Sequence, residues 1–504
     1  MAFRKILFAI VSGYLCYLAS RPHEWFLAIL GCAIFAFTLT DGSRRNRLIH
    51  SVVFAAAMYI PLLTWMKTLG VDAWVLISLL SILPWLLLAL LPTLDKSLRS
   101  IANYSCAVVL IEYVHSAVPL GGFPWGLLAY TQLDGPLIWL ARLGSQYAVS
   151  FAVVFVGLMM WRAYSLKSVR ALGVLAIACG AGAVLFGATN AQTTTLKVAA
   201  IQGNVPRLGY DPFTQAMFVT ENHIAQTNSF IADIAHGNAV QPDLVIWPEN
   251  GVDGDPLSAA NSELFNRIQT MVNELNVPAI IGALILDSAA LRPTNSGLLW
   301  QPAQEKIPGS ESFTHAGVAQ RYDKIHLVPF GEYIPNRAFF TQYIGRLGQV
   351  PVDFRPGSVP GIFDVGSLKV GDVICFEIAY DDHVRATLAT GASLLAVQSN
   401  NATYAHTEQP RQQLAITRFR AIEHQRSTVV ATTTGYSAVI RPDGSLLDVS
   451  REMTADVVSG EVPLNSAKQI SDYLSDWIVV FFACYLGLTL LSIRRNSKGA
   501  TWIR

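Results

Sequence analysis

The chain contains 504 residues, of which 52% are hydrophobic and only 14% are charged, and its formal net charge is +1. Because an ordinary soluble domain carries about 25% charged residues, this composition indicates a membrane protein. The near-neutral charge provides no broad basic surface, which argues against nucleic acid as a partner. At this length the chain has room for a membrane bundle and a complete globular domain.

Apolar segments that could cross a membrane fill most of the N-terminal part of the chain and recur once near the C-terminus. The hydrocarbon core of a bilayer is about 30 Å thick and requires about 20 apolar residues of helix. The sequence therefore predicts a polytopic α-helical membrane bundle. Its eight candidate spans lie near 5–20, 25–40, 50–66, 73–93, 102–118, 146–162, 171–188 and 476–493.

The distribution of Lys and Arg predicts how these spans are oriented. With the N-terminus inside, fourteen Lys and Arg residues fall in the inside segments and three fall in the short outside loops, namely Arg21, Lys67 and Arg142. Seven crossings then place the long segment after them outside the cytoplasm. We expect a membrane domain with about seven helices at 1–192, an extracytoplasmic domain at 193–467, and a C-terminal helix with a cytoplasmic tail at 468–504.

The extracytoplasmic segment has the pattern of a soluble α/β domain. Short apolar, β-branched runs that end in polar or turn residues predict strands, and helical patterns lie between some of them. This alternation favours sheets that are covered by helices. The strand-like runs are TLKVAAIQGN, DLVIWPEN, PAIIGALIL, KVGDVICFE, SLLAVQSNN and STVVATTTGYSAVI, and the helical stretches include FTQAMFVTENHIAQTNSFIADIA and EQPRQQLAITRFRAIEHQR.

Cys375 differs in its setting from the other five cysteines. It follows the strand-like KVGDVI in the extracytoplasmic domain, where an unpaired thiol is a candidate reactive group. A buried strand cysteine is the alternative, but the C-terminal end of a strand is where open α/β sheets place their ligand sites. The other five fall in predicted spans, where cysteine is usually a small buried hydrophobe: Cys16, Cys32, Cys106, Cys179 and Cys484.

Two further polar residues have a similar placement. Glu249 follows the strand of DLVIWPEN, and Lys324 lies in a polar turn of RYDKIHLVPFGEYIP. Each alone is more simply interpreted as a solvated side chain, but together with Cys375 they supply what thiol acyl chemistry requires. Because little of a free thiol is ionised at neutral pH, Glu249 would take its proton. Lys324 and the backbone N–H of Phe376 would stabilise an oxyanion.

The stretches WPEN, YDKIHLVPFGEYIP and ICFE resemble the Glu-Lys-Cys motifs of the nitrilase superfamily. With the membrane spans around them, nearly the whole chain resembles the apolipoprotein N-acyltransferases of bacteria. Phe376 replaces the tyrosine that is usual in Gram-negative members, and QSNNATY is closer to the actinobacterial branch. The chain is too short for the polyprenol-phosphate mannose synthase domain that some of that branch carry. Other similar stretches are GGFPWGLLAYTQ, AAIQGNVPR and RFRAIEHQRSTVVATTTGYSAVI.

This resemblance implies a nitrilase-like αββα sandwich on the outer side of a bacterial cell membrane, and a two-step reaction. Cys375 would take a fatty acyl chain from a membrane phospholipid as a thioester. The acyl group would then pass to the free amino group of the diacylglyceryl-cysteine that begins an apolipoprotein. Glu249 would be the general base and Lys324 the oxyanion stabiliser. No cofactor and no metal ion are expected, and the partners would be the phospholipid, the apolipoprotein and the bilayer.

Supporting roles are implied for four other residues. Glu332 and Glu377 match acidic positions of the family and would orient Lys324 and the turn at Cys375, with purely structural hydrogen bonding as the alternative. Trp125 lies in a predicted outside loop. The resemblance implies that it belongs to a lipid entry region, and the simpler interpretation is that it anchors the protein at the membrane interface. Tyr210 would replace a tryptophan of the family.

Three rival functions are weighed against this one. A membrane-anchored nitrilase-type amidase would use water as the second acceptor, but hydrolysis of small amides does not require eight spans. A non-enzymatic transporter is disfavoured because the spans contain almost no ionisable residues apart from Glu112. A papain-like pair would need a histidine base, and no local signature supports any of the candidates His326, His383, His406 and His424.

Overall fold

The computed structural model describes residues 2–168, 194–205, 218–287, 292–303, 305–306, 313–314, 317–343 and 352–499, together with the single residues 173, 180 and 182. The chain forms two compact units. We call Met1–Ala188 with Ile422–His424 and Gln469–Arg504 the helical unit, and Thr189–Ala421 with Gln425–Lys468 the α/β unit.

The helical unit has a helix at seven of the predicted spans, and the prediction at 171–188 lies almost entirely outside the described residues. Among the described residues, the segments long and apolar enough to cross a membrane are Val71–Leu90, Ile138–Leu166 and Ile470–Ile493. The helices are α1 (Ala2–Leu18), α2 (Phe26–Leu39), α3 (Arg44–Leu62), α4 (Val71–Ile82), the 3-10 helix η2 (Leu83–Leu90), α5 (Leu98–Ala117), α6 (Ala141–Leu166) and α13 (Ile470–Gly499).

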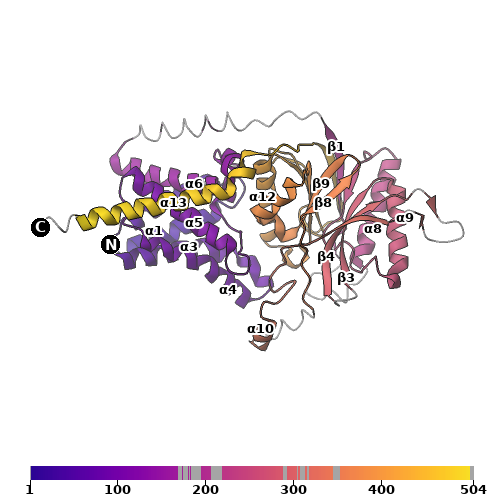
Figure 1. Cartoon of the computed structure of the whole chain (residues 1–504), viewed down its shortest axis with the longest axis horizontal. Coiled ribbons are helices and arrows are strands. Elements are labelled where there is room, and N and C mark those ends of the chain that lie inside the picture. Colours follow the sequence, from indigo (N-terminus) through magenta and orange to yellow (C-terminus); the bar gives the residue numbers. More distant parts are fainter. Residues whose placement is uncertain are drawn as a thin grey trace. The chain divides into compact units, whose positions relative to one another are not determined.

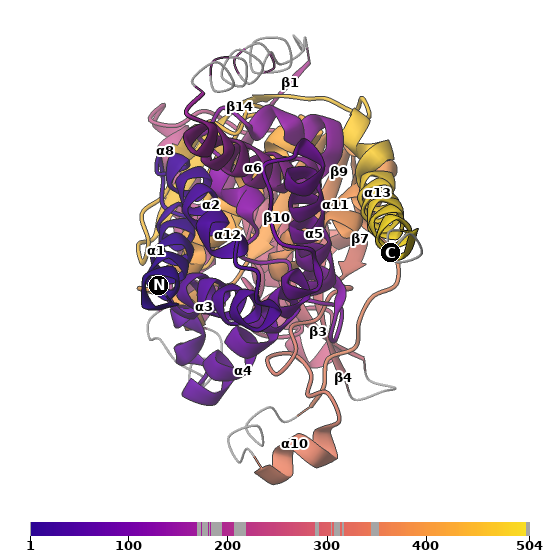
Figure 2. The same ribbon diagram turned by 90° about the vertical axis from the view of Figure 1, so that its left-hand side faces the viewer.

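Apolar packing joins the C-terminal helix α13 to the helices of the N-terminal part. Phe482 of α13 stacks on Phe151 of α6 with ring centroids 4.8 Å apart, and Figure 2 shows α13 beside α5. The segment after residue 469 therefore packs with helices that come from the first 168 residues. The buried members of this small core are Cys106, Val109, Tyr147, Val479 and Phe482.

Glu112, the ionisable residue of the fifth predicted span, has a structural partner. Its Oε1 accepts a hydrogen bond of 2.8 Å from the backbone N–H of Leu128, and only 1% of the residue is exposed. Buried polar groups in a bundle are stable when they are satisfied in this way. Glu112 therefore caps the start of the 3-10 helix Leu128–Gln132.

The α/β unit contains two six-stranded sheets, in the orders β14-β1-β2-β3-β4-β7 and β13-β12-β11-β10-β9-β8, and a separate pair β5-β6. Every predicted strand is confirmed. The strands are β1 (Thr195–Gln202), β2 (Leu244–Ile246), β3 (Ala279–Asp287), β4 (Arg292–Gln301), β5 (Glu305–Lys306), β6 (Phe313–Thr314), β7 (Gly317–Asp323), β8 (Gly361–Val365), β9 (Leu368–Ile374), β10 (Leu394–Ser399), β11 (Ser427–Thr432), β12 (Ala438–Ile440), β13 (Leu446–Val449) and β14 (Asp456–Pro463).

Helices cover both outer faces of the paired sheets, as the alternating pattern predicts. Figure 1 shows α8 and α9 on the side of β3 and β4, and α12 on the opposite side, next to β9. Ile246, Val370 and Val429 are among the fully buried residues that fill the space between the sheets. The helices of this unit are α8 (Phe218–Ala235), α9 (Ser262–Leu275), α10 (Arg337–Tyr343), α11 (Asp381–Ala389) and α12 (Gln409–His424).

The strand directions bring several chain turns to one edge of the sandwich. β1, β2 and β3 are parallel, and β7 is antiparallel to β4, which is itself antiparallel to β3. β2 and β7 therefore end at the same edge, and each is followed within three residues by a candidate catalytic group. In the second sheet β9 is parallel to β10 and ends directly before Cys375. This arrangement is the reason why residues far apart in sequence can form one site.

Candidate active site

Glu249, Lys324 and Cys375 come together in the α/β unit, and all three are buried, with 4%, 1% and 9% of each residue exposed. Lys324 Nζ lies 2.9 Å from Glu249 Oε1. The charges of Glu249 and Lys324 both act on the pKa of the Cys375 thiol, so the thiol lies close to this pair. A thiol, a carboxylate and an ammonium are therefore brought together in one buried site.

A second carboxylate, one side-chain amide and one backbone N–H fix the positions of these groups. Glu332 Oε1 lies 3.0 Å from Lys324 Nζ, so the ammonium stands between two carboxylates. Asn295 Nδ2 donates to Glu249 Oε1 at 2.6 Å and to Glu332 Oε1 at 2.8 Å. The other oxygen of Glu249 accepts from the backbone N–H of Asn400 at 2.8 Å. The general-base candidate is thus held at both of its oxygens.

The charges of the cluster follow from burial and proximity. Burial by itself would lower the pKa of Lys324, but the Glu249 and Glu332 carboxylates outweigh it and raise that pKa well above its usual value. Burial also raises the pKa of Glu332, against the attraction of Lys324. Burial and the Glu249 charge raise the pKa of Cys375, so the resting sulfur is a neutral thiol. The thiolate must therefore be generated during the reaction.

Cys375 occupies a strained position at a sharp strand-to-helix turn. Its φ is +56°, in the left-handed region that non-glycine residues avoid. It directly follows the last residue of β9 and is the first residue of the 3-10 helix η7 (Cys375–Ala379). Such strain persists only where surrounding contacts impose it, and it is typical of functional sites.

Glu377 supplies much of that surrounding structure. It is fully buried and accepts hydrogen bonds from the backbone N–H groups of Ile374 at 2.8 Å, Ile325 at 2.6 Å and His326 at 3.0 Å. Burial opposes ionisation, yet a hydrogen bond from His383 and the charges around it lower the pKa of Glu377 to about 2. One carboxylate therefore ties the turn before Cys375 to the segment that follows Lys324.

The histidines of the rival cysteine–histidine hypothesis have other neighbours. His383 Nε2 lies 3.5 Å from Glu377 Oε2, and the His326 ring stacks on Tyr380 at a centroid distance of 4.2 Å. The groups that shift the pKa of Cys375 are carboxylates and Lys324, and no histidine stands among them in the described part of the chain.

Of the remaining predicted residues, Phe376 directly follows Cys375, Trp125 belongs to the helical unit, and Tyr210 has no described position. Phe376 is half-buried, with its ring edge-on to Tyr380 at 5.2 Å. Trp125 belongs to the helical unit, is 2% exposed, and packs against Trp65 with ring centroids 5.6 Å apart. Tyr210 lies outside the described residues.

Three residues that the sequence analysis did not select contribute to the site. Asn295 joins the two carboxylates, Asn400 fixes Glu249 through its backbone, and Gln413 Nε2 lies 3.9 Å from Cys375 Sγ. Arg420 of α12 is fully buried and donates to the carbonyl of Ala379, at the end of η7, at 2.8 Å. The run QSNN, in which Asn400 directly follows the end of β10, was a signal that pointed to Asn400.

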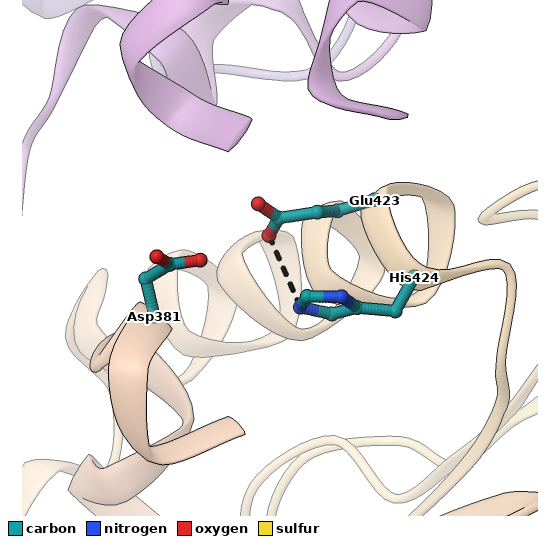
Figure 3. A group of neighbouring side chains, drawn as sticks. All are labelled: Asp381, Glu423 and His424. Atoms are coloured by element: carbon teal, nitrogen blue, oxygen red, sulfur yellow. Dashed lines mark ion pairs between the residues drawn. The ribbon is translucent and has the colours of Figure 1, made fainter. Parts of the chain in front are cut away.

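A second group of buried charges lies outside the proposed site. Glu423 Oε2 and His424 Nε2, at the end of α12, are 3.5 Å apart (Figure 3), and His424 Nδ1 lies 2.7 Å from Asp472 Oδ1. Asp381, also labelled in Figure 3, is ion-paired with Arg385 at 3.0 Å within the α/β unit. These charges have protein partners, and we assign them no catalytic role.

Comparison with known families places the chain in a class of enzymes. The family profile described as carbon-nitrogen hydrolase matches residues 197–472, which is more than half of the chain. A second profile, apolipoprotein N-acyltransferase N-terminal domain, matches residues 12–159. The α/β unit is therefore a carbon-nitrogen hydrolase domain, the nitrilase-like fold that the motifs predict.

Similar proteins narrow this class. Apolipoprotein N-acyltransferase of Mycolicibacterium smegmatis is 33% identical over 86% of this chain and 76% of the relative. Apolipoprotein N-acyltransferase of Geobacter metallireducens is 27% identical over 98% of this chain and 96% of the relative. A crystal structure of an amidase from Nesterenkonia sp. is 18% identical, with a TM-score of 0.38, over 57% of this chain and 96% of that one. The chain belongs to the apolipoprotein N-acyltransferase family, and the predicted resemblance is confirmed.

Proposed function

We propose that the chain transfers a fatty acyl group from a membrane phospholipid to the N-terminal amino group of diacylglyceryl-cysteine in apolipoproteins, through a thioester on Cys375. Family membership makes the chain an acyltransferase of lipoprotein maturation. The observation that supports the proposed chemistry is the buried 2.9 Å contact of Lys324 with Glu249, two groups whose charges both act on the pKa of the Cys375 thiol. The phospholipid, the apolipoprotein and the bilayer are the proposed partners.

In the first half-reaction Glu249 takes the proton of Cys375 as the sulfur attacks the carbonyl carbon of the phospholipid ester. The carbonyl electrons move to oxygen, and Lys324 Nζ, together with the backbone N–H of Phe376, stabilises the oxyanion. When the intermediate collapses, the ester C–O bond breaks and Glu249 returns the proton to the leaving alkoxide. The products of this step are a lysophospholipid and an acyl-enzyme.

In the second half-reaction the amino group of the apolipoprotein attacks the thioester carbonyl. Glu249 takes a proton from the attacking nitrogen, the C–S bond breaks, and the sulfur electrons return as a thiolate that is then protonated. An amide forms and Cys375 is restored. Because Lys324 is paired with both Glu249 and Glu332, it keeps its charge through both steps. Glu332 and Glu377 act as positioning residues in this scheme.

The test of the proposed function uses purified full-length protein in micelles that contain a diacyl phospholipid of defined acyl chains. The acceptor is a synthetic diacylglyceryl-cysteine peptide with a free amino group, and the matched control is the same peptide with that group acetylated. We expect lysophospholipid and a triacylated peptide to form in equal amounts with the free peptide alone. Release of free fatty acid without peptide acylation would instead identify a hydrolase and overturn the proposal.

We further propose that the protein crosses the membrane about eight times, with 193–467 outside the cytoplasm. The bias of Lys and Arg toward the inside segments supports this orientation. In intact cells, a membrane-impermeant maleimide should label Asn238→Cys, at an exposed position of the α/β unit, and should not label Gly42→Cys, in an inside segment. Labelling of Gly42→Cys alone would reverse the orientation.

A further inference from the structure

Gln413 is the amide that faces the reactive sulfur. It lies one turn into α12, 4% exposed, and its Nε2 is 3.9 Å from Cys375 Sγ and 2.8 Å from Ser399 Oγ. Hydrogen bonds to sulfur are longer than those to oxygen, so the distance of 3.9 Å between Gln413 Nε2 and Cys375 Sγ is that of a hydrogen bond to the reacting atom. Neither the nitrilase-like motifs nor the mechanism above assigns Gln413 a role.

The surrounding hydrogen bonds determine which end of the Gln413 amide faces the sulfur. Its Oε1 accepts from Asn401 Nδ2 at 2.8 Å and from Gln409 Nε2 at 3.0 Å. With the amide in this orientation, its oxygen faces two N–H donors and its NH₂ group faces Ser399 and Cys375. Asn401 uses its second N–H on Gln409 Oε1, at 2.9 Å. An N–H donor is therefore aimed at the sulfur by a buried network.

We propose that Gln413 is a further catalytic residue, which stabilises the Cys375 sulfur as an anion by donating a hydrogen bond from Nε2 to Sγ. The proposal deepens the proposed function and rests on it. In the first half-reaction the sulfur becomes negative as its proton moves to Glu249. In the second it becomes negative again, when the C–S bond breaks and the sulfur receives the bonding electrons.

The rest of the site shows why such a donor is needed. The Cys375 sulfur faces Glu249, whose charge disfavours a thiolate, and the ammonium of Lys324 is already shared between two carboxylates. A hydrogen bond from a neutral N–H strengthens when its acceptor becomes charged. Gln413 therefore contributes little to the resting thiol and most to the charged sulfur, which is the requirement for a catalytic contact.

The test measures the thiol directly and does not depend on acyl transfer. Full-length Gln413→Leu and wild-type protein in detergent are treated with iodoacetamide across a range of pH, and alkylation of the peptide that contains Cys375 is followed by mass spectrometry. Loss of one hydrogen bond to a charged group typically reduces the equilibrium constant for forming that charge by a factor between about 10 and 100. We expect the midpoint of the alkylation profile of Gln413→Leu to rise by about one pH unit or more. Gln412→Leu, the neighbouring glutamine on the same helix, should keep the wild-type profile.

Gln413→Glu keeps the size of the side chain but replaces the N–H donor with a carboxylate oxygen, so its midpoint should rise at least as far. If Gln413→Leu does not fold, this second variant can still be measured. An unchanged midpoint in a folded variant of Gln413, or an equal shift in Gln412→Leu, would overturn the role of Gln413. If wild-type protein fails to acylate the peptide while the midpoint shift appears, the proposed function is wrong and the thiolate contact stands.

Discussion

Cys375→Ala is expected to form no acyl-enzyme when the purified protein is exposed to phospholipid. The thiol is the proposed nucleophile of the described site, and its removal leaves Glu249 and Lys324 paired with each other at 2.9 Å. Cys375→Ser should be almost as inactive, because Glu249 is a weak base for an alcohol whose pKa lies far above that of a thiol. Loss of the nucleophile therefore removes the whole reaction rather than slowing one step.

The measurement is mass spectrometry of each variant after incubation with phospholipid, with the adduct located by peptide. Cys484→Ala is the matched control, because Cys484 is a free and exposed cysteine of α13, outside the α/β unit. It should acquire one acyl group at Cys375, as wild-type protein does. A covalent acyl group on Cys375→Ala would mean that another residue carries the intermediate, and the mechanism would be wrong.

Local sequence pattern was sufficient to place Glu249 and Cys375, because they follow the ends of the apolar strands β2 and β9. Lys324 was placed by its polar turn and the motif around it, because the strand before it, β7, has the mixed sequence GVAQRYD. The parallel direction of neighbouring strands then makes their C-terminal ends converge. Glu332 and Glu377 lie within eight residues of a triad member, so the same motifs included them.

Asn295 and Gln413 could not be placed in this way, because their roles depend on contacts between distant segments. Asn295 lies inside β4, and it reaches Glu249 and Glu332 only because β4 pairs with both β3 and β7. Gln413 lies on a helix whose charged residues suggest a salt-bridged surface. Its closeness to Cys375 arises from the packing of α12 beside the ends of β9 and β10, which no local period encodes.

The second large effect is expected for Glu249→Gln, which keeps the size of the side chain but cannot take a proton. Loss of a general base typically reduces the rate by about 10²- to 10⁴-fold, so thioester formation should fall by that factor. A hydrogen-bond conflict adds to the loss. Glu249 accepts from Asn295 Nδ2 at one oxygen and from the Asn400 N–H at the other, and an amide has only one oxygen, so its NH₂ group must face a donor.

The same substitution should make the thiol more reactive toward a simple reagent. The Glu249 carboxylate raises the pKa of Cys375, and Lys324 lowers it. Removing the carboxylate leaves Lys324 beside the sulfur with one negative neighbour fewer, so the pKa of Cys375 should fall and the thiolate should form at lower pH. Alkylation by iodoacetamide at neutral pH should therefore be faster in Glu249→Gln than in wild-type protein, while acyl transfer from phospholipid is slower.

This opposite response distinguishes a catalytic base from a structural residue. In a damaged site the rates of alkylation and acylation would change in the same direction. Loss of the base alone changes them in opposite directions. Glu263→Gln, at an exposed position of α9, is the control and should change neither rate. If Glu249→Gln forms the thioester at the wild-type rate, the proton of Cys375 is taken by another group. If its alkylation slows in proportion to its acylation, Glu249 holds the site together without acting as its base.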